Sequence, residues 1–146
     1  MATFRLEILT PERRLVAESA DSVVFETSDG EMQVLPGHEA MVLPVRPCAA
    51  RIGSVSGRGV ASITAGFVEI SQEKVEFFVD SAEWPNEIDS ERAKGALERA
   101  ESRLGSQGEA WDIARAKAAA ARASARLKAR DLQRLVPGGN SPSADS

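Results

Sequence analysis

The sequence is poor in the residues that form covalent cross-links and metal sites. Among its 146 residues there is one cysteine, Cys48, and one histidine, His38. A lone cysteine excludes an internal disulfide and a cage of thiolate ligands. With one histidine, a zinc or iron site would have to be built almost entirely from carboxylates, so we expect no metal.

Long apolar runs and targeting features are also missing. No stretch approaches the roughly 18 apolar residues of a membrane-spanning helix. The chain starts with Met1-Ala2-Thr3-Phe4 and passes directly into an alternating pattern. It shows neither the apolar core of a signal peptide nor an Arg/Ser-rich transit segment, and we therefore expect a cytosolic protein.

Enzyme motifs are equally scarce. The sequence has no P-loop, dinucleotide-binding fingerprint or nucleophile motif. Glu31 with His38 could form an acid–base pair, and Cys48 with His38 a thiol–imidazole pair, but no oxyanion-hole motif or orienting third group accompanies the thiol–imidazole pair. A solvent-facing turn histidine and a buried or loop cysteine explain these residues without chemistry. We predict a non-catalytic protein.

Charge is distributed unevenly along the chain. The formal net charge is −4, with 27% charged and 42% hydrophobic residues, which is the balance of a globular protein. Residues 1–85 contain 7 basic and 13 acidic side chains, whereas residues 105–146 contain 7 basic and 4 acidic ones. A basic C-terminal third indicates an interaction surface, although basic helices are also common as solvated faces.

The first 85 residues have the pattern of short strands. Phe4, Leu6 and Ile8 alternate with Arg5 and Glu7, as in a strand with one buried face. Turn residues such as Thr10-Pro11-Glu12, Ser28-Asp29-Gly30, Pro36-Gly37-His38 and Ser56-Gly57-Arg58-Gly59 separate further segments of this kind. Those segments are residues 15–17, 23–25, 32–35, 41–43, 50–52, 60–63, 67–70 and 75–79. Their number and spacing predict an antiparallel β-sandwich or barrel.

At Trp84-Pro85-Asn86 the hydrophobic period changes to that of a helix. Asp89 is the expected N-cap, and Gly105 is expected to end the helix as a C′ residue. One narrow apolar seam runs along it: Ala93, Leu97, Ala100 and Leu104. The sequence therefore predicts a first helix directly after the strands.

A second, longer helix is predicted to follow. Ser106-Gln107-Gly108-Glu109 has the form of a capping box, and Pro137-Gly138-Gly139 should stop the helix. The expected seam is Trp111, Ala114, Ala118, Ala121, Ala125, Leu132 and Leu135. Two helices joined by about four residues form an antiparallel hairpin, and a seam of alanines holds it weakly. Residues 137–146 are polar and predicted to be disordered.

Several motifs together resemble the epsilon subunit of F-type ATP synthases. They are Thr10-Pro11-Glu12, Gly30-Glu31, the Val34-to-His38 run, Ala65-Gly66-Phe67-Val68-Glu69-Ile70, Ala82-Glu83 and Ile88-Asp89-x-x-Arg92-Ala93. Each is weak alone, but their order covers residues 3 to about 135. The chain departs from the family at Glu39-Ala40, where a small residue followed by proline is common, and at Cys48, where glycine is usual.

The resemblance implies a sandwich of about ten strands over residues 1–85, a regulatory helical hairpin over 86–136 and a tail over 137–146. The sandwich would bind the gamma subunit and the ring of c subunits. The hairpin would either fold against the sandwich or extend along gamma toward the beta and alpha subunits and hinder ATP hydrolysis. The protein would be a non-catalytic rotor component on the cytoplasmic face of the bacterial inner membrane.

The resemblance also assigns roles to individual residues. Glu31 and His38 become candidate contacts to the c-ring. A regulatory ATP, with no cofactor required, would be held by Ile88, Asp89, Arg92, Ala93, Arg99, Arg122 and Arg126. A basic ridge formed by Arg122, Arg126, Arg130 and Arg134 would meet acidic side chains of beta.

Other interpretations of these residues remain open. Helix caps and salt-bridged surface arginines explain the ATP motif without a ligand, and a solvated face explains the ridge. Nucleic-acid binding is disfavoured because the protein is acidic and the second helix carries no interleaved aromatics. A free-standing β-sandwich adaptor with a helical tail is the alternative to a subunit of ATP synthase.

Overall fold

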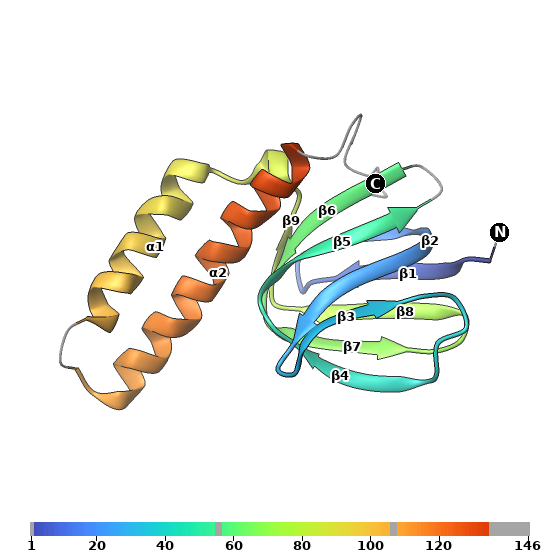
Figure 1. Cartoon of the computed structure of the whole chain (residues 1–146), viewed down its shortest axis with the longest axis horizontal. Coiled ribbons are helices and arrows are strands. Elements are labelled where there is room, and N and C mark those ends of the chain that lie inside the picture. The colour runs from blue at the N-terminus through green and yellow to red at the C-terminus, as the bar shows by residue number, and fades with distance from the viewer. Residues whose placement is uncertain (1, 55–56, 106–107, 135–146) are drawn as a thin grey trace.

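The computed structural model describes residues 2–54, 57–105 and 108–134. In this part of the chain nine strands precede two long helices (Figure 1). The strands are β1 (Phe4–Leu9), β2 (Arg14–Thr27), β3 (Gly30–Val34), β4 (Met41–Val45), β5 (Cys48–Ser54), β6 (Gly57–Ile63), β7 (Gly66–Ile70), β8 (Lys74–Val79) and β9 (Ala82–Glu83). The predicted β-sandwich is confirmed, with nine described strands where the resemblance implied about ten.

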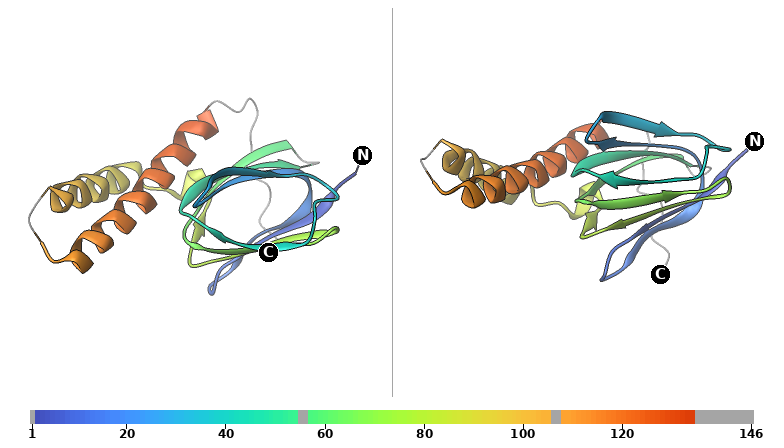
Figure 2. Two further views of the ribbon diagram at one scale, coloured as in Figure 1. Left: turned by 60° about the horizontal axis from the view of Figure 1, so that its bottom comes forward. Right: turned by 90° about the horizontal axis from the view of Figure 1, so that it is seen from below.

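The strands form one continuous hydrogen-bonded sheet that folds over into two layers (Figure 2). Its order is β4-β7-β8-β1-β2-β5-β6-β9, with β3 also paired to β2. The first half of β2 pairs with β1, and its second half pairs with β5 and β3. The sequence predicted two short strands at 15–17 and 23–25, but they are parts of this single 14-residue strand, whose register shifts between Ala20 and Ser22.

The core lies between the two layers and consists of the inward-facing side chains of the alternating strands. Phe25 of β2 and Phe77 of β8 meet edge to face, with ring centroids 5.1 Å apart, and both are fully buried. Burial of such apolar surface is the main stabilising contribution, at ~25 cal/mol per Å². Cys48 belongs to this core, and its burial raises the pKa of the thiol to about 11. The interpretation of Cys48 as a structural residue is therefore supported.

The turns that connect the strands follow the predicted chemistry. Between β1 and β2 the hydroxyl of Thr10 accepts the backbone N–H of Arg13 at 3.0 Å. Gly30 and Gly37 have φ angles of 117° and 84°, a left-handed region that favours glycine. The Ser56 end of the predicted Ser56–Gly59 turn lies outside the described residues.

A short 3₁₀ turn, η1 (Pro85–Glu87), leads from β9 into the first helix, α1 (Ser90–Leu104). Asp89 caps α1 as predicted, because its Oδ1 accepts the backbone N–H of Arg92 at 3.1 Å. The helix ends at Leu104, but Gly105 stays right-handed with φ −81°, so it does not form the left-handed C′ cap that the sequence suggested.

The second helix, α2 (Ala110–Arg134), packs against α1 and lies between α1 and the sandwich (Figures 1 and 2). The hairpin prediction is confirmed, but the predicted seam of α2 is wrong in its first half. Trp111 is 58% exposed, and Ala114 and Ala118 are exposed as well. The buried side chains of α2 are Ala116, Ala123, Ala125 and Ala129. The capping box at Ser106-Gln107, Leu135, the Pro137-Gly138-Gly139 stop and the tail over 137–146 fall outside the described residues.

Candidate functional site at the junction of sandwich and hairpin

The hairpin docks on the sandwich through a small apolar contact near the C-terminal end of α2. Ala129 is fully buried against Val60 of β6 and Ile88, which directly follows η1. Ala49 and Leu132 extend this contact and remain partly exposed. Because a buried methyl group contributes far less than a buried leucine or phenylalanine, the apolar part of the docking is weak.

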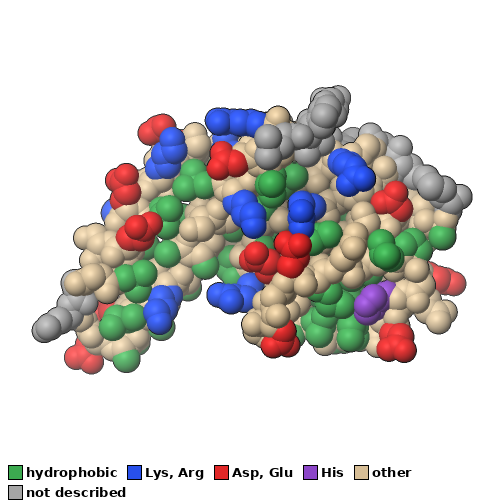
Figure 3. Space-filling model, in the orientation of Figure 1, with side chains coloured by type: hydrophobic (Ala, Val, Ile, Leu, Met, Phe, Trp, Pro, Cys, Tyr) green, Lys and Arg blue, Asp and Glu red, His purple; other side chains and the backbone are tan. Residues whose placement is uncertain are grey.

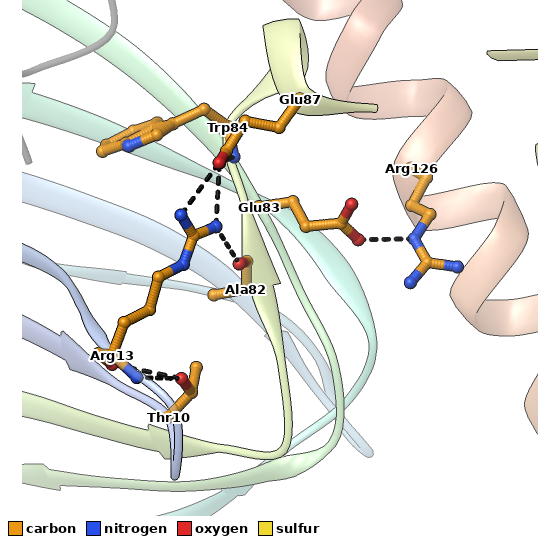
Figure 4. Close-up of polar contacts among 7 residues, drawn as sticks. All are labelled: Thr10, Arg13, Ala82, Glu83, Trp84, Glu87 and Arg126. Atoms are coloured by element: carbon orange, nitrogen blue, oxygen red, sulfur yellow. Dashed lines mark hydrogen bonds and ion pairs between the residues drawn. The ribbon is translucent and has the colours of Figure 1, made fainter. Parts of the chain in front are cut away.

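Two arginines of α2 add polar contacts to the docked state. Arg126 donates through Nε to Oε1 of Glu83 at 2.7 Å (Figure 4). Arg130 donates through Nη1 to the carbonyl oxygen of Ile88 at 2.8 Å, and at 3.4 Å to that of Pro85. Both arginines belong to the predicted basic ridge, so in this conformation half of that ridge faces the sandwich and the junction.

The remaining ridge residues have different surroundings. Arg122 and Arg134 are exposed, and neither has an ion pair with a described residue. Arg115, on an earlier turn of α2, lies over the ring of Trp111 at 5.6 Å from its centroid. Although Trp111 is exposed and lies outside the core, this cation–π contact gives its ring a partner on the same helix.

A separate cluster fixes the chain where the sandwich passes into the hairpin (Figure 4). Arg13 donates two hydrogen bonds of 2.8 Å to the carboxylate of Glu87 and a third, also 2.8 Å, to the carbonyl oxygen of Ala82. The same carboxylate accepts the backbone N–H of Trp84 at 2.8 Å. The Arg13 guanidinium holds the pKa of Glu87 below its ordinary value, and Glu87 raises the pKa of Arg13.

A cavity of about 360 Å³ opens beside these two ion pairs. Its lining consists of Glu83, Glu87, Asp89, Arg92, Ala93, Ala96, Arg99 and Arg126. The structure thus brings together five of the seven residues that the resemblance assigned to ATP. Ile88 lies apart from the cavity because its side chain is buried against Val60 and Ala129, and Arg122 lines a different cleft.

The charges of this cavity suit a polyphosphate in part. Among the described residues, Arg92 and Arg99 have no ion pair, so their guanidinium groups are available to phosphate oxygens. Arg126 is held by Glu83, and it would have to leave that carboxylate to add a third donor. Arg92 and Arg99 therefore fit a phosphate-bearing ligand directly, and Arg126 fits one after a local exchange of partners.

Sequence reasoning did not select Glu83 and Glu87 as residues of this cavity. Both precede the helix that carries the recognised pattern, and their partners Arg126 and Arg13 are distant in sequence. The one local signal was the capping-box arrangement at Trp84, in which Glu87 reaches back to the backbone N–H. The pairing with Arg13 and Arg126 depends on tertiary structure and has no signature in one sequence.

The two candidate c-ring residues do not lie together. Glu31 stands at the start of β3, where its carboxylate pairs with Arg51 at 2.7 Å. His38 follows the other end of β3, and its Nδ1 lies 2.9 Å from the carbonyl oxygen of Glu39. A surface that used both side chains would have to extend along the whole of β3 (Figure 1).

An apolar row crosses the outer face of one layer. Pro44 of β4 is opposite Phe67 of β7, Phe67 is opposite Phe78 of β8, and Phe78 is opposite Leu9 of β1. The rings of Phe67 and Phe78 are stacked with centroids 5.1 Å apart, and Phe67 is 43% exposed. A continuous row of exposed and half-buried apolar side chains is typical of a surface that another protein covers.

Within the described ranges the structure contains no group of three or more His, Cys, Asp or Glu side chains that could hold a metal ion. Neither α1 nor α2 is both long and apolar enough to span a membrane. Lys and Arg side chains lie along the border between hairpin and sandwich (Figure 3). The most prominent features of this junction are therefore its arginines and their carboxylate partners.

These features define the class of the protein as a two-part β + α chain, with a β-sandwich on which a C-terminal helical hairpin docks through alanines and arginines. The family description "ATP synthase, Delta/Epsilon chain, beta-sandwich domain" matches residues 3–85, and its "long alpha-helix domain" matches residues 86–130. The chain belongs to the ATP synthase delta/epsilon chain family, and it is a non-catalytic subunit.

Curated relatives agree with this assignment over almost the whole chain. The ATP synthase epsilon chain of Ruminiclostridium cellulolyticum is 44% identical over 134 residues, which cover 92% of this chain and 100% of the relative. That of Staphylococcus haemolyticus is 40% identical over 134 residues, with 91% and 100% covered. A chain in the structure of the Euglena gracilis mitochondrial ATP synthase superimposes with a TM-score of 0.77 at 26% identity, covering 88% of this chain and 81% of the other.

Proposed function

We propose that residues 1–85 join the gamma subunit to the c-ring and that the hairpin over 86–136 regulates ATP hydrolysis. Family membership replaces the alternative of a free-standing adaptor. The observation that carries the regulatory role is the docking contact itself. It combines a small apolar contact around Ala129 with the polar contacts of Arg126 and Arg130, and this set is small enough for the hairpin both to dock and to leave.

The same arginines serve both positions of the hairpin. Arg126 and Arg130 bind the sandwich and the junction when α2 is docked. After α2 leaves, they join Arg122 and Arg134 in a ridge of four guanidinium groups at four-residue spacing. That ridge suits acidic side chains on the beta subunit, with the alpha subunits alongside. Because Arg126 and Arg130 cannot bind the sandwich and the beta subunit at the same time, docking of the hairpin opposes inhibition.

The apolar row of Pro44, Phe67, Phe78 and Leu9 is the proposed surface for gamma. It lies on a rigid layer of the sandwich and presents aromatic side chains that solvent would otherwise cover. Glu31 and His38 remain the proposed contacts to the c-ring, at the two ends of β3. Through these partners the protein would sit at the cytoplasmic face of a bacterial inner membrane as a peripheral subunit.

ATP is the proposed regulatory ligand of the arginine cavity. Arg92 and Arg99 offer guanidinium groups that have no ion pair with any described residue, Asp89 and Ala93 lie at the start of α1, and Arg126 comes from α2. Because Glu83 and Glu87 of the sandwich side line this cavity together with both helices, it is complete only when the hairpin is docked. A ligand that fills the cavity would therefore stabilise the docked state by RT ln(1 + [L]/Kd). ATP would thus act by keeping the arginine ridge away from beta.

Truncation tests these domain roles. A chain that ends at Asn86 should remain folded, because the core cluster of the sandwich includes no residue of either helix. We expect it to bind gamma as the full chain does and to support coupled ATP synthesis, while ATP hydrolysis is no longer inhibited. A truncated sandwich that is folded by circular dichroism but fails to bind gamma would contradict the assignment.

A further inference from the structure

A second cleft, separate from the arginine cavity, lies between α2 and the end of the sandwich. Its volume is about 450 Å³, and it shares no lining residue with the arginine cavity. One wall comes from the connections that follow β4, β6 and β8, and the other from the middle of α2. A volume of this size is within the ~300–1,000 Å³ range of small-molecule sites.

The sandwich wall of this cleft is held by hydrogen bonds. The backbone N–H of Arg46 donates to the carbonyl oxygen of Glu26 at 3.0 Å. The hydroxyl of Thr64 accepts the backbone N–H of Ser81 at 2.8 Å and donates to the carbonyl oxygen of Ser81 at 3.2 Å. This wall is therefore already formed before any ligand arrives.

The cleft has an excess of unpaired positive charge. Arg46, Lys117 and Arg122 line it, and within the described part of the chain none of them has an ion pair. Among the described lining residues Asp80 is the one carboxylate, so two of the three positive charges remain uncompensated there. By contrast, Arg126 of the same helix lies 2.7 Å from a carboxylate. Cations gathered around a concave surface attract an anion.

The rest of the lining is apolar and small. Pro47 and Ala65 contribute from the sandwich, and Ala118 and Ala121 contribute from α2. We propose that this cleft binds a dianionic phosphate monoester with a compact apolar body. Arg46, Lys117 and Arg122 would surround the phosphate group, because guanidinium forks and an ammonium group match its oxygens in charge and geometry. The alanines and Pro47 would contact the apolar body.

Such a ligand would act on the hairpin without using the ATP cavity. Since Lys117 and Arg122 belong to α2 and Arg46 belongs to the sandwich, the complete site exists only when the hairpin is docked. A bound phosphate monoester would therefore shift the hairpin toward the docked position. The proposal also gives Arg122 a role in the docked state that is distinct from the one suggested by the resemblance.

Phenyl phosphate is a suitable probe because it joins a phosphate group to an apolar ring. Inorganic phosphate is the comparison ligand, because it has no apolar body. Calorimetric titration of the full chain should show binding of phenyl phosphate that weakens with added salt, and weaker binding of inorganic phosphate. Arg46→Ala and Lys117→Ala should each reduce the affinity by about two- to fivefold, as expected for partly screened charge pairs, and the double variant should reduce it further.

Matched variants separate this site from its surroundings. Arg58→Ala removes an exposed arginine of the sandwich that does not line the cleft, and it should leave the affinity for phenyl phosphate unchanged. In Arg92→Ala, which weakens the ATP cavity, the binding that depends on Arg46 and Lys117 should persist. Equal binding by the parent and the Arg46→Ala/Lys117→Ala variant would overturn the proposal, as would complete loss of binding in Arg92→Ala. If vesicles that contain phosphatidic acid compete with phenyl phosphate, the phosphate group belongs to a lipid. If they do not compete, it belongs to a soluble molecule.

Discussion

Arg126 and Glu83 are 43 residues apart in sequence, yet their side chains form a 2.7 Å ion pair that joins the second helix to the last strand of the sandwich. About a third of each side chain is exposed, so solvent screens the pair only in part. It lies at the edge of the arginine cavity and beside the alanine contact. This pair is therefore well placed to decide whether the hairpin is docked.

Replacing Glu83 with glutamine should raise the undocked fraction of the hairpin. Loss of a partly screened charge pair costs about 0.5–1 kcal/mol, or a two- to fivefold shift of the docking equilibrium. Hydrogen exchange of α2 amides measures this shift. Glu98→Gln on α1, an exposed carboxylate with no partner among the described residues, is the control and should exchange like the parent. If the α2 amides exchange at the same rate in Glu83→Gln and Glu98→Gln, the pair between Arg126 and Glu83 does not control docking.

Ala129→Glu should undock the hairpin while the sandwich stays folded. Ala129 is fully buried against Val60 and Ile88, so a carboxylate there would be buried without a partner. Ala114→Glu is the control, because Ala114 is exposed on the same helix and glutamate keeps helix propensity high at both positions. Energy transfer between dyes on the hairpin and the sandwich should fall for Ala129→Glu and stay unchanged for Ala114→Glu.

The pair between Arg13 and Glu87 predicts a loss of stability in acid. The folded state lowers the pKa of Glu87 below its ordinary value of 4.5. Its contribution is therefore complete above about pH 4.5 and is lost as the pH falls through the lower, folded-state pKa. Arg13 stays protonated throughout this range and adds no slope. Glu87→Gln should be less stable than the parent at about pH 6, and the difference should shrink toward about pH 3 in urea unfolding.

ATP should bind the isolated protein, and the arginines of the cavity should differ in their effects. Arg92→Ala removes a guanidinium group that pairs with no carboxylate in the described part of the chain, so it should reduce only the affinity for ATP. Arg126→Ala also breaks the pair with Glu83, so it should reduce both the affinity and the docked fraction without ATP. Lys94→Ala, on α1 but outside the cavity lining, is the control. No calorimetric heat at millimolar ATP would rule out the ligand role.

The arginine ridge can be divided into two pairs with opposite expectations. Arg122→Ala with Arg134→Ala removes two charges that bind no described part of the sandwich, so it should relieve inhibition of ATP hydrolysis. Arg126→Ala with Arg130→Ala removes ridge charge but also loosens docking, so its net effect should be smaller. Replacing all four should relieve inhibition most, because several screened pairs must act together. If the fourfold variant still inhibits ATP hydrolysis as strongly as the parent at low salt, the inhibition comes from steric blockage by the helix.

The sequence predicted the sandwich because its inward side chains are large and alternate strictly, as Phe4, Leu6 and Ile8 do. It predicted the start of α1 because the Asp89 cap is a local interaction. It did not predict which face of α2 is buried, because alanines occur on every face of that helix. Trp111 was the one strong signal for a buried face, and it was misleading because this side chain is exposed.

Part of the candidate site could be predicted from the resemblance. Asp89, Arg92 and Arg99 belong to its first-helix pattern, it also assigned Arg126 of α2, and all four line the cavity. Glu83 could not be chosen, because nothing in its surroundings indicates a partner 43 residues later. The length of β2 was missed for a related reason. Its polar middle, Glu18 to Ser22, breaks the alternation where the strand passes from one layer to the other.

This crossing strand has a mechanical consequence. The backbone of β2 is bonded to β1 in one layer and to β5 and β3 in the other, so sliding one layer past its neighbour would have to rupture a ladder of hydrogen bonds. A twisting load applied to one face should reach the opposite face with little shear. The hairpin is attached by methyl groups and a few ion pairs, so it should detach from the sandwich under much smaller forces than those needed to shear the two layers. The molecule therefore combines a stiff coupling element with a compliant one in a single short chain.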